Sequence, residues 1–191
     1  MVKRGLIPSA PGTTAVYDNA AYILAAAAAA KAAGKPLDEH LASALFGPLG
    51  LPEGSWDWWK DAAGTRYGHA GLVLTADGLL AFGRLWLDGG WRGTERVLSE
   101  AFVAEATKTQ NPADPTFGLG WLLLGRDVRG KAPWDGFWMN GTDGQVLYVH
   151  PPSGLVCVQL VERSLAPDEQ RPFVGVVLDQ CRKLARALTP R

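Results

Sequence analysis

Apolar and polar residues follow each other mostly at helical spacing over the first 115 residues. The segment from about Ala20 to Ala33 is almost entirely alanine and is followed by Gly34, which predicts a helix that ends at a left-handed glycine. A second helix, closed by Gly47-Pro48, is predicted from leucines that recur at i, i+4 and i+8. These leucines are Leu37, Leu41 and Leu45.

Two further helices are predicted, each preceded by a hydroxyl side chain that can cap it. Thr75 ends the short apolar run HAGLVLT and precedes a helical pattern that Gly89-Gly90 stops. The apolar residues of this pattern are Leu80, Phe82 and Leu85. Ser99 precedes a shorter pattern, which contains Phe102, Val103 and Ala106. The aromatic-rich segment 56–67 shows no period, so a loop is predicted there.

After Pro115 the pattern changes to short apolar runs separated by turns. The runs FGLGWLLLG, GFWMNG, QVLYVH and LVCVQLVE predict strands, and Pro151–Gly154 predicts a hairpin between the last two. A final helix is predicted from Asp168 to Leu188, with apolar side chains on one face. These are Phe173, Val176, Val177, Leu184 and Leu188. The sequence therefore predicts one α+β domain, mostly helical over about 1–115, with an antiparallel sheet and a covering C-terminal helix over about 116–191.

The composition is that of a globular chain, with 47% apolar and 20% charged residues among 191. Lysine plus arginine equals aspartate plus glutamate at 19 each, so no net field favours binding to nucleic acid or anionic lipid. No apolar run is long enough for a transmembrane helix, and the N-terminal residues lack the apolar stretch of a signal peptide. These features favour the cytoplasm without deciding the localisation.

Neither the cysteines nor the histidines show the spacing of a metal site. Cys157 and Cys181 are far apart and are expected to be buried small apolar residues rather than a disulfide. His40, His69 and His150 are expected to be surface or core residues. The sequence therefore predicts no metal and no cofactor.

The nonapeptide PGTTAVYDN, residues 11–19, precedes the alanine-rich helix and has two interpretations. Asp18 or Asn19 is a suitable N-cap for the helix whatever the function, with Tyr17 packed ahead of the cap. Alternatively, Tyr17 and Asn19 belong to an active site, where the positive end of the helix favours a phenolate. The nonapeptide alone leaves both open, and they are compatible.

Four segments, taken in order, resemble the serine β-lactamase and penicillin-binding-protein superfamily, and most closely its class C β-lactamase, esterase and nylon-oligomer-hydrolase branch. PGTTAVYDN is similar to the family pattern P-G-[ST]-x-x-x-Y-[SD]-N before a helix, and LFGPLGL to its helix-ending turn. AGLVLTADGLLAFGRLWLDGG resembles the G-G-L-x-x-T-x-x-D-L-x-x-F segment, and GTDGQVLYVHPPSGLVCVQL the final hairpin. The resemblance covers nearly the whole chain and implies a β-lactamase/transpeptidase-like fold.

The resemblance also implies acyl transfer. In the family, the serine of an S-x-x-K motif attacks an amide or ester carbonyl, and water then hydrolyses the acyl-enzyme. By position, Tyr17 corresponds to the general base and Asn19 to the amide that orients the substrate. The implied substrate is a small amide or ester.

The third family motif, K-T-G or H-x-G, corresponds here to Met139-Asn140-Gly141. The resemblance implies that these residues and Thr142 border the substrate, with the Thr142 N–H as an oxyanion donor. Methionine has no charge to bind a substrate carboxylate, which argues against β-lactam binding in the usual manner. An apolar cleft lining or core packing is expected of five tryptophans, namely Trp56, Trp58, Trp59, Trp134 and Trp138.

None of the six serines is followed three residues later by lysine. Since S-x-x-K precedes Y-x-N in the family, we expect the chain to be the C-terminal part of the domain, without the N-terminal strands and the S-x-x-K helix, and inactive alone. A non-catalytic binding module on the same scaffold and one half of a split enzyme are the alternatives. Because the family's N-terminal strands pair with the strand LVCVQLVE, we expect self-association or poor solubility unless the missing segment is present.

Overall fold

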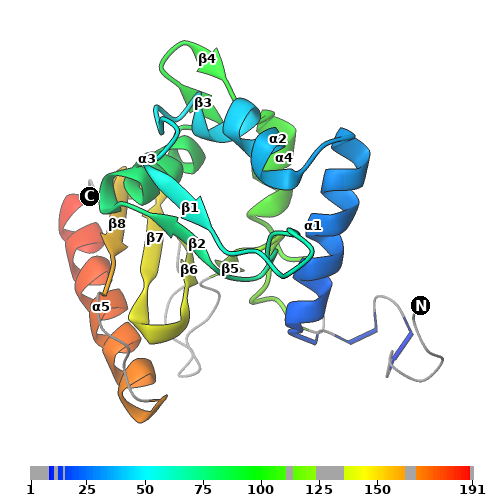
Figure 1. The fold of residues 1–191 in the computed structure, drawn as a ribbon. Helices are drawn as coiled ribbons and strands as arrows, with labels where there is room; N and C mark the ends of the chain where they lie inside the picture. The colour runs from blue at the N-terminus through cyan, green and yellow to red at the C-terminus, as the bar shows by residue number, and fades with distance from the viewer. Residues whose placement is uncertain are drawn as a thin grey trace.

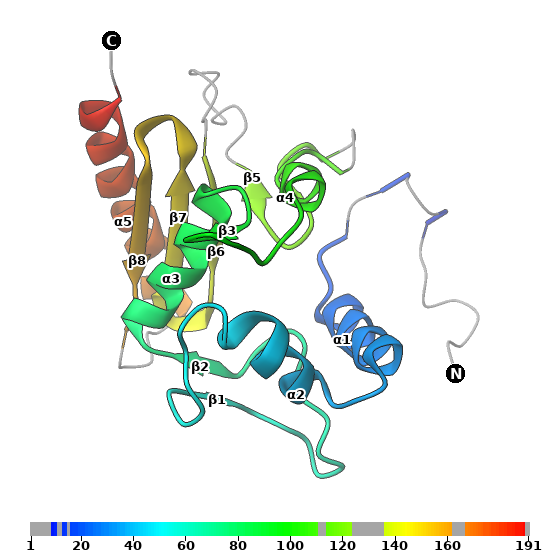
Figure 2. The ribbon, with the colours of Figure 1, turned by 90° about the horizontal axis from the view of Figure 1, so that it is seen from above.

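The computed structural model describes residues 9–10, 13–14, 16–110, 114–123, 136–161 and 167–189. An antiparallel sheet with the order β5-β6-β7-β8 lies between helices (Figure 1). Its strands are β5 (Leu122–Leu123), β6 (Phe137–Asn140), β7 (Val146–His150) and β8 (Leu155–Gln159). Figure 2 shows α3 (Ala76–Leu87) on one face of the sheet and α5 (Pro167–Leu188) on the other. The predicted α+β architecture is thus confirmed.

Strand β7 forms the centre of these layers because apolar side chains point to both of its faces. Leu147 and Val149 belong to the cluster on the α3 side, whereas Val146 and Tyr148 belong to the cluster on the α5 side. This is the period-two alternation of a strand, with both faces buried. The first cluster also contains Trp86, Val103, Ala106, Trp121 and Phe137, and the second contains Leu178, Cys181 and Ala185.

Helix α3 lies close to the sheet at a glycine. A Cβ on Gly83 would lie 2.6 Å from Val156 Cγ1 and 2.7 Å from Leu147 Cδ1, so no side chain fits there. The helix begins as predicted, with Thr75 Oγ1 accepting a hydrogen bond from the backbone N–H of Gly78 at 3.1 Å. It ends at Leu87, just before the predicted glycine pair.

Helix α1 (Asn19–Ala33) has a different environment, since none of its side chains is buried. Its N-cap is Asp18, whose carboxylate accepts a hydrogen bond from the Ala20 N–H at 2.8 Å, so Asn19 is the first helical residue and not the cap. Gly34 ends the helix with φ of 67°, as predicted. In Figures 1 and 2, α1 lies at the end of the molecule opposite α5.

The second predicted helix is confirmed as α2 (Leu37–Leu41), which continues as a π-helical turn over Ala42–Phe46. The predicted loop 56–67 is partly wrong, because it begins with strand β1 (Trp56–Trp58), which pairs with β2 (Leu72–Leu74). A short hairpin of β3 (Trp91–Arg92) and β4 (Glu95–Arg96) was not predicted. Helix α4 (Glu100–Ala106) carries the predicted Ser99 cap. Strands of two or three residues are too short to show a period.

The buried face of α5 differs from the predicted one. Leu178, Cys181 and Ala185 are buried against the sheet, whereas Val176, Leu184 and Leu188 are exposed. Val177 is partly buried as expected, and the Phe173 side chain lies outside the described residues. The helix thus carries two rows of apolar residues, the predicted one and the buried one. The small side chains of Cys181 and Ala185 in the buried row allow the helix to lie close to the sheet.

Both cysteines are free, as predicted; Cys181 is buried as expected, whereas Cys157 is only partly buried beside it in the same apolar cluster. A hydrogen bond with Cys181 and burial together raise the pKa of the Cys157 thiol above its usual range. The thiol is therefore protonated at neutral pH, as suits a packed apolar residue.

Candidate active site

A cleft of about 730 Å³ lies between α1 and the edge of the sheet. Its walls come from four parts of the chain: the start of α1, the segment around β5, strand β6 with the turn that follows, and α5. These contribute Tyr17 and Tyr22; Phe117, Gly120, Trp121 and Leu122; Trp138, Met139, Asn140, Gly141 and Thr142; and Val174, Gly175 and Leu178. Segments distant in the sequence thus meet at one concave site.

Most of the residues that the sequence pointed to line this cleft. Tyr17 lies on one wall and the strand residues 139–142 lie on another. Asn19 is not among the lining residues, so its role as a substrate-orienting amide stays a prediction. Trp138 lines the cleft, whereas Trp134 falls outside the described residues. The tryptophans at 56, 58 and 59 are not among the lining residues.

Tyr17 is exposed and belongs to a group of three aromatic rings. Its side chain is 66% exposed, and its ring centroid lies 5.8 Å from that of Tyr22 and 6.3 Å from that of Phe117. Burial and the nearby Tyr17 raise the pKa of Tyr22, so this second phenol stays protonated and can donate a hydrogen bond into the cleft. Sequence reasoning missed Tyr22; the signal was a tyrosine one turn into the helix that follows Tyr17.

The opposite wall is the end of β6 and the turn into β7. Asn140 pairs with Val146, and the Gly141 N–H donates to the Gln145 carbonyl at 2.9 Å, which closes the turn. Residues Thr142–Gly144 form one 3₁₀ turn. The first N–H groups of such a turn have no partner within it, so they suit the predicted donation to an oxyanion.

Glycine is favoured at the two ends of this turn for different physical reasons. Gly144 has φ of 92°, the left-handed region that favours glycine. Gly141 has φ of −102°, which any residue adopts, but a Cβ there would lie 3.1 Å from Gln145 Cγ. Gly141 is therefore small because of a close contact and not because of its backbone angle.

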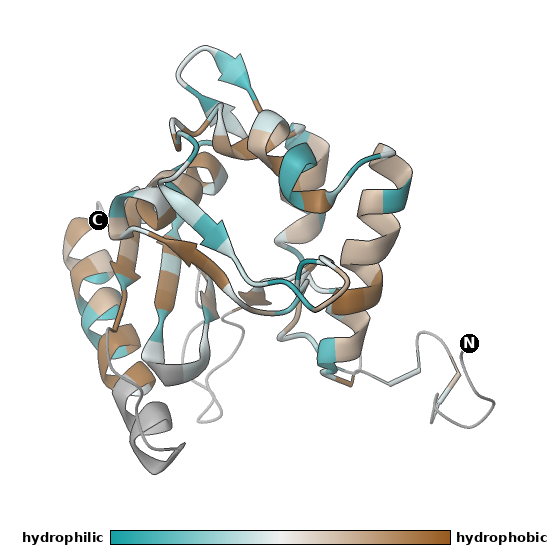
Figure 3. Cartoon of the chain, viewed as in Figure 1, coloured by the Kyte–Doolittle hydropathy of each residue, from teal (hydrophilic) through white to brown (hydrophobic). Residues whose placement is uncertain are grey.

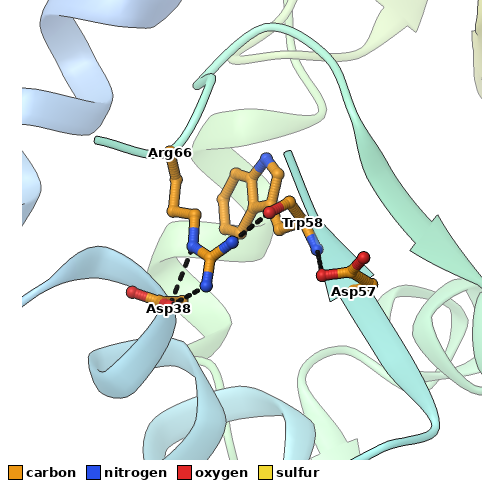
Figure 4. Close-up of polar contacts among 4 residues, drawn as sticks. All are labelled: Asp38, Asp57, Trp58 and Arg66. Atoms are coloured by element: carbon orange, nitrogen blue, oxygen red, sulfur yellow. Dashed lines mark hydrogen bonds and ion pairs between the residues drawn. The ribbon is translucent and has the colours of Figure 1, made fainter. Parts of the chain in front are cut away.

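The position of α1 beside the cleft is fixed by the segment between β1 and β2. A Cβ on Gly68 would lie 2.4 Å from the Tyr22 carbonyl oxygen and 2.5 Å from Ala26 Cβ, so this segment rests directly on α1. Arg66, two residues earlier, holds the segment in place (Figure 4). Tyr17 and Tyr22 are thus positioned from outside the core.

Arg66 joins three parts of the chain. Its Nε and Nη2 donate to Asp38 Oδ2 in α2 at 2.8 and 2.6 Å, and its Nη1 donates to the Trp58 carbonyl at the end of β1 (Figure 4). Burial alone would raise the pKa of Asp38, but the hydrogen bonds and charge of Arg66 lower it overall. The carboxylate is therefore ionised and paired at neutral pH.

The cleft lining is uncharged where the structure describes it. The fourteen lining residues include no aspartate, glutamate, lysine, arginine or histidine, and no serine or cysteine. Nor do the described residues contain a group of three or more histidine, cysteine, aspartate or glutamate side chains that could hold a metal ion. No helix among them is long and apolar enough to cross a membrane.

Comparisons with known proteins show the family of this chain. The Beta-lactamase family model matches residues 3–175, so the chain belongs to the Beta-lactamase family. A curated relative from Salmonella schwarzengrund, named "Putative D-alanyl-D-alanine carboxypeptidase", is 22% identical over 168 residues, which cover 65% of this chain and 38% of the relative. The chain thus spans less than half the length of that protein.

Solved structures show the same fold. A structure from Bacillus anthracis, titled "Putative 6-aminohexanoate-dimer hydrolase", matches with a TM-score of 0.69 and 19% identity, over 96% of this chain and 47% of the other. A β-lactamase from Mycobacterium bovis matches with a TM-score of 0.66 and 22% identity, over 91% of this chain and 66% of the other. EstCE1, described as a hydrolase with promiscuous acyltransferase activity, matches with a TM-score of 0.63 and 19% identity, over 87% and 57%. At these identities the three structures show the fold, whereas the family match supports serine hydrolase-type acyl transfer as the chemistry of the family.

Proposed function

We propose that the cleft is the substrate-binding half of an acyl-transfer site that hydrolyses a small amide or ester. The observation that carries the proposal is the meeting of Tyr17 with the strand residues 139–142 across one cleft. A proton relay and backbone donors on opposite walls are what an acyl transfer requires, because the attacking hydroxyl loses a proton while the carbonyl oxygen gains charge.

In the proposed reaction, a serine Oγ adds to the substrate carbonyl carbon and the phenolate of Tyr17 takes the serine proton. The Thr142 N–H binds the oxyanion, and the proton then passes to the leaving amine or alcohol as the acyl-enzyme forms. Water hydrolyses that ester by the same relay in reverse. A phenol of ordinary pKa about 10 needs a nearby cation to act this way at neutral pH.

Neither the serine nor the cation is found among the described lining residues, and no S-x-x-K motif is present in the sequence. The proposal therefore assigns both groups to polypeptide beyond the residues given, and the chain alone is expected to be inactive. Met139 in place of a lysine, together with the uncharged lining, favours a neutral substrate over one with a carboxylate.

Incubation of the purified chain with p-nitrophenyl acetate and with nitrocefin tests this. We expect no acylated serine in the intact-mass spectrum and no turnover above that of Tyr17→Phe. Ser153→Ala is the control, because Ser153 Oγ lies 2.7 Å from His150 Nδ1, an imidazole that can act as a base in background acylation. An acyl group on a serine of this chain that turns over with Tyr17-dependent kinetics would overturn the predicted inactivity.

The alternative is a binding module that uses the same cleft without catalysis, and the uncharged lining without a nucleophile favours it. Co-expression with a segment that carries S-x-x-K separates the two. Turnover that is restored by the segment and lost in Tyr17→Phe supports the enzyme, in one chain or as a split pair. Ligand binding without turnover in the complex supports the module.

A further inference from the structure

Two glutamine side chains, Gln145 and Gln159, form hydrogen bonds with backbone in and next to the turn that follows β6. Gln145 Nε2 donates to the Val161 carbonyl at 3.2 Å, and Gln145 Oε1 accepts from the Val161 N–H at 2.8 Å. Gln159 Nε2 donates to the Gly144 carbonyl at 2.8 Å. All three bonds join a side chain to backbone on the neighbouring strand or turn.

The two hydrogen bonds of the Gln145 side chain continue the pairing of β7 with β8 beyond its last backbone pair. Val146 pairs with Gln159, the last residue of β8, and the Gln145 side chain then bonds both polar groups of Val161 two residues further along. A primary amide offers one acceptor and two donors, so it matches the N–H and C=O of a peptide group. Flipping the amide would set donor against donor and acceptor against acceptor, so its orientation is fixed.

Gln145 is in direct contact with the cleft wall. Its carbonyl accepts the Gly141 N–H at 2.9 Å, and its Cβ and Cγ lie against the face of Gly141 where a side chain would be. Gln159 fixes the other end of the turn through the carbonyl of Gly144, a glycine in the left-handed region. A shift of either glutamine therefore moves the backbone of residues 141–144.

We propose that Gln145 and Gln159 are positioning residues that set the direction of the Thr142 N–H group toward the cleft. The assignment rests on the proposed function, since that N–H group is its oxyanion donor. Donors of this kind must be held to within about 0.5 Å, and side chains behind them supply that rigidity when their own hydrogen bonds are complete.

The test compares Gln145→Ala, Gln145→Glu and Gln159→Ala with the wild-type chain. Glutamate has the size of glutamine but sets a carboxylate oxygen against the Val161 carbonyl, so it keeps the packing and loses the donor. Gln110→Ala is the matched control, because Gln110 Nε2 also bonds backbone, at Glu105 O (2.7 Å), but the residue does not line the cleft. The readouts are the ¹H–¹⁵N resonances of Gly141 and Thr142 and the affinity for phenylacetamide, a neutral amide.

We expect both Gln145 variants to shift the Thr142 amide resonance and to weaken phenylacetamide binding about tenfold, the loss of roughly one hydrogen bond. Gln159→Ala should have a smaller effect, and Gln110→Ala none. Unchanged resonances in Gln145→Glu would overturn the proposal, since packing alone would then suffice. If the wild-type chain does not bind phenylacetamide, the proposed substrate site fails, while the resonances still decide the role of the glutamines.

Discussion

Helices α1 and α5 both border the cleft, but they are held in opposite ways. α5 buries Leu178, Cys181 and Ala185 against the sheet and exposes Asp179, Lys183 and Arg186. α1 is apolar on nearly all sides, has Lys31 as its one charged residue, and buries no side chain. Figure 3 shows the contrast, with alternating colours along α5 and brown tones along most of α1.

The difference shows that the two walls of the cleft have unequal support. A helix that is apolar all round is normally buried, but α1 buries no side chain, although Gly68 rests on it. The sheet wall and α5 are part of the core, whereas the wall with Tyr17 is formed by a helix that buries no side chain and is contacted by the loop that Arg66 holds. The four experiments below test this inequality.

Truncation of one leucine on each helix should give the largest contrast. Leu178→Ala removes a side chain that is 7% exposed and packed on the sheet, so we expect a loss of about 2–5 kcal/mol in the free energy of unfolding. Leu24→Ala changes a side chain that is 62% exposed and should stay within about 0.5 kcal/mol. Urea denaturation measures both, and equal losses would contradict the comparison.

Adding a methyl group to a helical glycine tests the packing of the core layers. Gly83→Ala places a Cβ 2.6 Å from Val156 Cγ1, so we expect a destabilisation of about 1–3 kcal/mol despite the better helix propensity of alanine. Gly175→Ala in α5 is the matched variant, because no atom lies within 4 Å of its added Cβ. It should stabilise the protein by up to about 1 kcal/mol. Thermal unfolding of the two variants gives shifts of opposite sign.

The ion pair of Arg66 with Asp38 predicts a pH-dependent contribution to the free energy of unfolding. Asp38→Asn weakens hydrogen bonds to a charged partner and should cost about 1–2 kcal/mol at pH 7. Because the pKa of Asp38 is lowered in the folded protein, its contribution is present above the unfolded pKa of about 4 and is lost as the pH falls through the lower folded value. The difference in the free energy of unfolding between wild type and Asp38→Asn should therefore disappear at acid pH. Glu53→Gln, at an exposed position, serves as control and should show no such difference.

Removal of the helix caps should have the smallest effects on stability, and each effect should be detected by a different measurement. Asp18→Ala removes the cap of α1 and Thr75→Ala that of α3, each worth about 1 kcal/mol. In α3 the loss should appear in the global free energy of unfolding, since that helix is part of the core. In α1 it should appear as faster amide hydrogen exchange within the helix, with little global change. Global loss from Asp18→Ala would show that α1 is coupled to the core.

An element could be predicted from the sequence where its own residues show a hydrophobic period or a capping residue. Thr75, Ser99 and the Pro151–Gly154 hairpin were predictable because local chemistry decides them. Tyr17 and Gly141 were found through the family resemblance, and only the fold could show that they meet at one cleft. Strand β1 and the buried stripe of α5 were missed because distant partners select them. Tyr22 and Gln145 were missed because their contacts are tertiary and no motif marks them.

The contact at Gly68 fixes the distance between α1 and the loop that follows β1. The loop touches the helix where a single added methyl group would clash, near Tyr22 and Ala26, while Tyr17 lies just beyond the helix end. A residue larger than glycine at position 68 would therefore have to displace α1, and Tyr17 on the cleft wall lies just before that helix. The size of one residue in a distant loop thus limits where this wall of the cleft can lie.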